Sequence, residues 1–192
     1  MVVVNIVVGL AVAFVVPLFN VYFRAGVHAH DSEIGVTFAS GALLLAIAAL
    51  FGPFLVARMG KIPAIISARL LGIPFVLLLA FAPDVERLSQ LSLLSIAGIA
   101  FVARNVFRNV ANPIASAFEM EILAPQERGT AVGASMAVFN LTFAIGGFAG
   151  AVMMNAGDFR TPFLWMAGLY LAGDLMYWFF FNKTTTVPEP RQ

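Results

Sequence analysis

Residues 34–57 read IGVTFASGALLLAIAALFGPFLVA and carry no charged side chain. A helix needs about 20 predominantly apolar residues to cross the hydrocarbon core of a bilayer. Similar stretches recur along the chain, which gives six expected spans, at about residues 3–23, 34–57, 62–81, 91–118, 130–155 and 162–181. Lipid cannot satisfy the backbone hydrogen bonds of an open sheet, and a barrel would show short alternating segments. The sequence therefore predicts an all-α membrane protein with six transmembrane helices.

The composition agrees with a membrane protein and excludes several other classes. Of the 192 residues, 61% are hydrophobic and 11% are charged, whereas a soluble domain carries about 25% charged residues. A net charge of +1 without a basic patch argues against nucleic acid as a partner. The chain has no cysteine, which excludes disulfides and thiolate metal sites. We expect no metal and no cofactor, and the chain has no GxxxxGK loop for ATP.

The distribution of basic residues predicts the orientation in the membrane. Cytoplasmic loops carry an excess of Lys and Arg. One side of the expected bundle holds Arg58, Lys61, Arg128, Lys183 and Arg191, and the other holds Arg24, Arg87 and Arg160. This bias places the first side, and with it both termini, in the cytoplasm. The six spans form one unit over residues 1–182, and the polar segment 183–192 is expected to be a disordered cytoplasmic tail.

Two loop sequences resemble a known family of transporters. The stretch GPFLVARMGK, residues 52–61, resembles the short cytoplasmic loop that occurs once per half in the major facilitator superfamily. Arg58, Gly60 and Lys61 fit that loop, whereas Ala57 stands where the family usually has an acid. The stretch RNVFRNVANPIASAFEMEILAPQERGTA, residues 104–131, resembles the region around the fourth span of the second half. Its matching residues are Arg104, Asn109, Pro113, Phe118, Met120, Glu121, Pro125, Glu127 and Arg128.

The resemblance implies a fold and a function. The family has twelve spans in two six-helix halves, and this chain resembles the C-terminal half. Its first span starts almost at residue 1, which suggests a fragment, a split gene, or a half that pairs with a missing N-terminal half or a second copy. The implied function is gradient-driven transport of a small organic solute, a drug or a metabolite, by alternating access, with protons as one coupling ion. The implied location is the inner membrane of a bacterium.

Other function classes remain to be weighed. The alternative to transport is a non-transporting membrane module or a truncated, inactive product. A membrane enzyme is not expected, because the chain has neither an HExxH nor a GxSxG motif. The loop residues that fit the family, Arg58, Gly60, Lys61, Glu121, Glu127 and Arg128, are expected to act in structure or gating.

Polar residues within the spans are the candidates for a functional site, because charges in the bilayer are costly. Arg104 and Arg108 lie four residues apart and share one helix face. One interpretation is a cationic site that lines a cavity and binds an anionic group of the solute. The other is a structural network with Glu119, Glu121 or helix-end carbonyls. Two neutral side chains, Asn105 and Asn140, are further cavity candidates that could hydrogen-bond the solute.

Arg69 and Asp174 are two further charged residues within the spans, and their positions allow an ion pair. By residue count, Arg69 and Asp174 lie at similar depth, roughly 10–12 Å from one end of their spans. We therefore predict a buried ion pair between Arg69 and Asp174. The rival interpretation makes Asp174 a proton carrier. Gly146 and Gly150 form a GxxxG pair, which favours close packing of two helices.

Overall fold

The computed structural model describes residues 2–121 and 124–181, and every regular element in these ranges is a helix. In chain order the elements are α1 (Val2–Ala13), the 3₁₀ turn η1 (Val16–Leu18), α2 (Phe19–Val21), the π turn η2 (Tyr22–Gly26), α3 (Asp31–Ala49), α4 (Gly52–Met59), α5 (Lys61–Ala80), α6 (Ala82–Leu88), α7 (Leu93–Val110), α8 (Asn112–Glu121), α9 (Arg128–Asn155) and α10 (Thr161–Phe181). Six helical stretches of the described chain are long and apolar enough to cross a membrane. The predicted all-α membrane fold is confirmed, whereas the expected tail at 183–192 lies outside the described residues.

Three of the six spans are broken near a proline. The first leaves regular α-helix after Ala13, four residues before Pro17, the second breaks before Pro53, and the fourth breaks before Pro113. Proline lacks the backbone donor of a continuous helix and its ring clashes with the preceding turn. Pro53 and Pro113 instead stand in the first turn of α4 and α8, where the missing N–H costs nothing. The positions of the prolines in the sequence predicted kinks in the spans, and the structure shows full breaks near three of them.

The short helix α6 replaces the loop that was expected after the third span. Proline occurs in its first turn together with Asp84, and Arg87 lies in its last turn. Both charges complement the helix dipole, since acids are favoured at the N-terminus and bases at the C-terminus.

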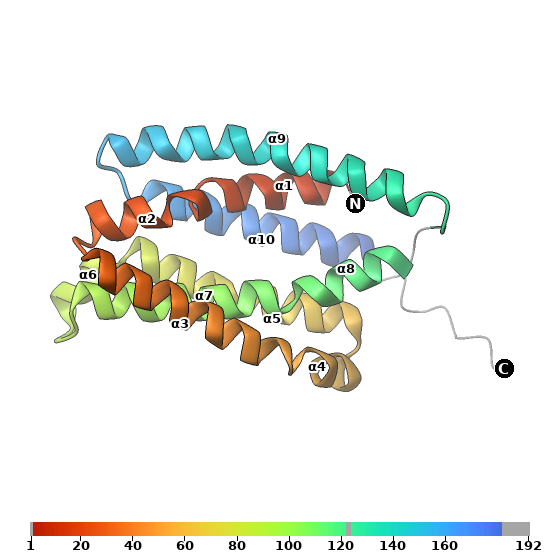
Figure 1. The fold of residues 1–192 in the computed structure, drawn as a ribbon, viewed down its shortest axis with the longest axis horizontal. Coiled ribbons are helices and arrows are strands. Elements are labelled where there is room, and N and C mark those ends of the chain that lie inside the picture. The colour runs from red at the N-terminus through yellow and green to blue at the C-terminus, as the bar shows by residue number, and fades with distance from the viewer. Residues whose placement is uncertain (1, 122–123, 182–192) are drawn as a thin grey trace.

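The long helices pack in a definite order. Helix α5 packs against α7 and α10, α1 packs against α9 and α10, and α3 packs against α7. Figure 1 shows the resulting bundle, with α9 along one edge and α3 with α4 along the opposite edge. Buried residues make up 44% of the apolar stretch of α5, but only 11% of that of α3 and 17% of that of α9. The two edge helices therefore leave most of their surface uncovered.

Glycines allow α1 and α9 to approach closely. A Cβ atom added at Gly150 would lie 2.0 Å from the carbonyl oxygen of Phe14, and one added at Gly146 would lie 2.6 Å from the Cβ of Ala13. Small residues are what permits such contact in a membrane, where no hydrophobic force drives helices together. The close packing predicted for this GxxxG pair is confirmed.

A glycine with positive φ lies in a turn at each end of the bundle. Gly60, with φ +82°, joins α4 to α5 at one end, and Gly157, with φ +83°, ends α9 at the other. After Gly157 the chain forms a Schellman turn, because the N–H of Gly157 donates to Met154 and that of Asp158 donates to Met153. Positive φ is unstrained only for glycine, so both turns need this residue.

Candidate functional site

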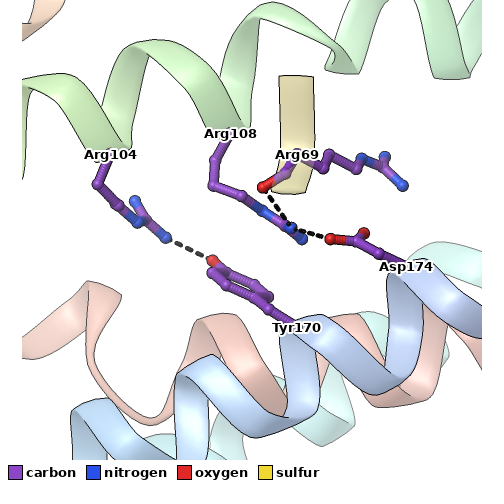
Figure 2. A network of polar contacts seen from close by, with 5 residues as sticks. All are labelled: Arg69, Arg104, Arg108, Tyr170 and Asp174. Atoms are coloured by element: carbon purple, nitrogen blue, oxygen red, sulfur yellow. Dashed lines mark hydrogen bonds and ion pairs between the residues drawn. The ribbon is translucent and has the colours of Figure 1, made fainter. Parts of the chain in front are cut away.

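The most deeply buried charges of the described chain lie between α5, α7 and α10. Arg104 and Arg108 project from the same face of α7, as their spacing predicts, and only 4% and 5% of their surface is exposed. Asp174, on α10, is 1% exposed. Figure 2 shows Arg108 and Asp174 directed toward each other from α7 and α10, and Arg104 directed toward Tyr170 of α10. Both arginines thus lie inside the bundle rather than on an open surface.

Asp174 forms its ion pair with Arg108. The Nη1 atom of Arg108 donates to Asp174 Oδ2 over 2.6 Å, and it also donates to the main-chain carbonyl of Arg69 over 3.4 Å. Helix α5 makes room for this side chain at Gly72, where an added Cβ would lie 3.0 Å from Arg108 Cγ. A side chain at position 72 would therefore crowd the stem of Arg108, which would have to shift.

Tyr170 connects the two arginines. Its hydroxyl accepts a hydrogen bond from Arg104 Nη2, and the Arg108 guanidinium carbon lies 3.5 Å from the centre of its ring. A cation over an aromatic face is attracted by the negative potential of the ring. The sequence argument missed Tyr170, although it precedes Asp174 by one helical turn and so shares its face.

The geometry gives Asp174 an ion-pair partner that the sequence argument did not name. That partner is Arg108, and Arg69 supplies its main-chain oxygen to the cluster. A pair between the side chains of Arg69 and Asp174 stays a prediction. The Arg69 guanidinium carbon itself lies 5.4 Å from the centre of the Tyr177 ring.

The partners of the two arginines are not those that the structural interpretation named. That interpretation named Glu119, Glu121 and helix-end carbonyls, whereas the contacts found are to Tyr170, Asp174 and the carbonyl of residue 69. Two buried atoms, Arg104 Nε and Asp174 Oδ1, have no hydrogen-bond partner in the described part of the chain. A buried polar atom without a hydrogen bond lowers the stability of the fold, because the low dielectric around it does not solvate it. The stability of a partly satisfied network therefore depends on small shifts of its side chains.

The predicted gating residues lie at the end of the bundle where α4 meets α5 and α8 ends. Lys61 Nζ lies 2.5 Å from Glu121 Oε2, and the two side chains are 42% and 54% exposed. Arg58 is exposed in the last turn of α4. The other two, Glu127 and Arg128, are exposed at the start of α9. The structure thus brings Lys61 and Glu121 together in an exposed ion pair.

The two asparagine candidates lie on different helices. Asn105 is half-buried on α7, where its Nδ2 atom would lie 3.6 Å from a Cβ added at Gly41 of α3. Asn140 is exposed on α9. Within the described ranges no hydrogen bond joins them. Their proposed roles in binding a solute stay predictions.

The comparison with known proteins supports the resemblance found in the loops. A search of the curated proteins found no match. A family model described as Major Facilitator Superfamily matches residues 1–192. Because this match covers the whole sequence, the chain belongs to the Major Facilitator Superfamily, a family of multi-pass membrane transporters rather than of enzymes.

Proposed function

We propose that this chain forms one half of a secondary transporter that moves a small organic solute by alternating access. The solute is a drug or a metabolite, and the energy comes from an ion or solute gradient. The proposal places the protein in the inner membrane of a bacterium, with the end that holds Arg58, Lys61 and Arg128 in the cytoplasm, since positive loops face that side.

The observation that carries this proposal is the uneven burial of the six spans. Helices α3 and α9 bury only 11% and 17% of their apolar stretches, and they lie at opposite edges of the bundle. Alternating access needs two bodies that rock about a central site. A second six-helix half, or a second copy of this chain, would cover the uncovered surface of these edge helices.

The buried charge cluster fits the needs of a rocking body. It ties α5, α7 and α10 together near the middle of the bundle, so these three helices move as one. The exposed pair of Lys61 and Glu121 differs, because an exposed ion pair contributes only about 0–1 kcal/mol and separates readily. We propose that this pair, with Arg58, Gly60, Glu127 and Arg128, belongs to the gate at that end.

Purified protein in vesicles tests the proposal. Proteoliposomes and protein-free vesicles are incubated, with and without an imposed pH gradient, in a defined mixture of nucleosides, sugars, amino acids and carboxylic acids. Mass spectrometry then measures the solutes retained. We expect at least one solute to be retained only with protein, in a saturable manner. Retention equal to that of protein-free vesicles for every solute would instead favour a non-transporting membrane module.

A further inference from the structure

The charges inside the membrane-spanning helices do not balance. More than one turn from the ends of the six apolar helical stretches, the described chain carries three arginines and one acid, namely Arg69, Arg104, Arg108 and Asp174. The acid forms its ion pair with Arg108. In the described part of the chain, no carboxylate lies within ion-pair distance of Arg104.

The contacts found for Arg104 are with neutral groups. Its Nη2 atom donates to the Tyr170 hydroxyl, and its guanidinium carbon lies 5.5 Å and 5.8 Å from the centres of the Phe19 and Tyr170 rings. A ring face attracts a cation but carries no net charge. The guanidinium itself is always charged, and only 4% of Arg104 is exposed. A buried charge without a counter-charge destabilises the fold, so a negative charge beside Arg104 would stabilise it.

Two hydrogen-bond donors at Arg104 and Tyr170 favour an acceptor beside them. The buried Nε atom of Arg104 has no hydrogen-bond partner among the described residues. Nε and Nη2 share one edge of the planar guanidinium, the edge that can bind an anion side-on. Tyr170 accepts from Nη2 at this same edge, and its own O–H can rotate toward a ligand there. The Nε–H of Arg104 and the O–H of Tyr170 thus lie close enough to serve one acceptor.

The site is enclosed by this chain alone. Arg104 and Tyr170 are 4% and 1% exposed without any second half against them. The uncovered surfaces of the bundle belong instead to the edge helices α3 and α9. A ligand between α7 and α10 is therefore held inside the six-helix unit, and only a small ion matches this degree of enclosure.

We infer that Arg104 and Tyr170 hold a small monovalent anion of the chloride class as a structural ligand. The anion accepts hydrogen bonds from the Nε–H and the O–H and neutralises the guanidinium. It joins α7 to α10 beside the ion pair of Arg108 and Asp174 (Figure 2). Water would accept the same hydrogen bonds but bring no charge. This inference is independent of the proposed transport, because it concerns the stability of the chain whatever solute it moves.

Chloride itself is the probe in the test. The purified full chain is unfolded thermally in detergent while chloride replaces gluconate stepwise at constant pH and ionic strength, so that general screening stays the same. Bromide, which has the same charge and a similar size, is the second probe. The quantity measured for each protein is the change of its own unfolding midpoint between the salts.

We expect the midpoint to rise with chloride and then to level off, because a ligand that binds only the folded state stabilises it in proportion to its occupancy. At a chloride concentration about ten times the dissociation constant, the rise should be about 3–6 °C for a chain of this length. Bromide should give a similar rise.

Variants of the two donors locate the effect. Arg104→Gln removes the charge and the Nε–H and should abolish the rise. Tyr170→Phe removes the O–H, so several-fold more chloride should be needed for the same rise, and this variant also serves if Arg104→Gln does not fold. The matched control is Arg87→Gln, an exposed arginine on α6, which should keep the full rise.

Two results would overturn the inference. A midpoint of the unchanged chain that does not depend on chloride would show that neutral contacts suffice for Arg104. A rise of equal size in Arg104→Gln would place the anion elsewhere. Retention of solutes in vesicles is a separate measurement, so the failure of the proposed transport and the failure of the anion site are distinguishable.

Discussion

The charge on Asp174 is stabilised mainly by Arg108. With 1% of its surface exposed, the carboxylate has little access to water, and the guanidinium at 2.6 Å replaces that hydration. Removing one partner of a buried pair leaves an uncompensated charge, which typically costs 3–5 kcal/mol. At the scale of single residues this pair is therefore the most sensitive point of the bundle.

The first prediction is a coupling between these two residues. Arg108→Met and Asp174→Leu should each lower the free energy of unfolding by about 3–5 kcal/mol, whereas the double variant should recover much of that loss, because neither charge of the pair remains. Thermal unfolding in detergent measures all four proteins. Purely additive losses would show that the pair is not coupled.

The second prediction separates the two roles of Tyr170. Tyr170→Phe removes the hydroxyl that accepts from Arg104 and keeps the ring that faces Arg108. A hydrogen bond to a charged group contributes about 1.5–3 kcal/mol, and we expect a loss in that range. Tyr170→Leu should cost about 0.5–2 kcal/mol more, since it also removes the cation–π contact. Equal stability of the two variants in detergent would contradict the ring's contribution.

The sequence could predict which residues matter here better than it could predict their contacts. A carboxylate in an apolar span is rare, so Asp174 was identifiable by itself. Its partner depends on the rotation of α5, α7 and α10 about their axes, which residue counting does not give. Arg69 was chosen by depth, whereas Gly72 and the direction of α7 bring Arg108 to the acid.

At the scale of helices, glycines decide how closely elements pack. The third prediction concerns Gly150→Ala, whose new methyl group would meet the carbonyl oxygen of Phe14 at 2.0 Å. Forcing extra volume into a packed contact costs about 1–3 kcal/mol, and we expect a corresponding loss of thermal stability. The matched control is Gly168→Ala on α10, where no atom lies within 4 Å. That change should be neutral or stabilising by up to about 1 kcal/mol, as alanine favours helix.

The fourth prediction concerns the start of α10. The Asp158 carboxylate accepts hydrogen bonds from the backbone N–H groups of Thr161 and Arg160, over 2.9 and 3.1 Å. Its pKa lies below the ordinary 3.8, chiefly because of its hydrogen bonds with Thr161. A lowered pKa stabilises the fold above pH 3.8 and loses this effect as the pH falls through the lowered value.

Asp158→Ala should therefore cost about 1 kcal/mol at pH 7, as lost caps do. The difference from the unchanged protein should narrow below pH 3.8. Unfolding midpoints of both proteins, measured in detergent from pH 2 to pH 8, check the trend. A difference that stays constant over this range would rule out the carboxylate as its source.

The breaks in the spans show what hydropathy does not report. The run at residues 34–57 carries no charge, yet the structure ends α3 at Ala49 and begins α4 at Gly52, directly before Pro53. Hydropathy measures affinity for lipid, which is the same on both sides of a bend. The prolines were visible in the sequence, but whether one bends, ends or merely continues a helix depends on its neighbours, and Pro74 stays within α5.

At the scale of the whole molecule, the fifth prediction tests the exposed pair at the proposed gate. Lys61→Glu places two acids side by side, and we expect solute uptake into vesicles to fall several-fold while thermal stability changes by no more than about 1 kcal/mol. Combining Lys61→Glu with Glu121→Lys should restore uptake, because the attraction is re-formed with reversed signs. Uptake that stays low in the combined variant would place the effect of Lys61 outside this pair.

The number of spans followed from the sequence, whereas their mutual packing did not. Each apolar run signals a crossing by its own composition. Which helices occupy the centre depends on contacts between runs far apart in the chain, such as α5 with α10. For the same reason the sequence placed Asn105 and Asn140 in separate spans, but could not show whether a hydrogen bond joins them.

The long sequence separation within the buried cluster has a consequence for biosynthesis. Arg104 and Arg108 each precede their partners on α10 by 66 residues. Translation proceeds at about 5–20 residues per second. The partner residues on α10 are therefore synthesised roughly 3–13 s after the two arginines of α7. During that time its two guanidiniums each carry an insertion cost of about 2.5–3.5 kcal/mol. Helix α7 should therefore remain beside the translocon until α10 arrives, which makes the last span a condition for membrane integration of the fourth.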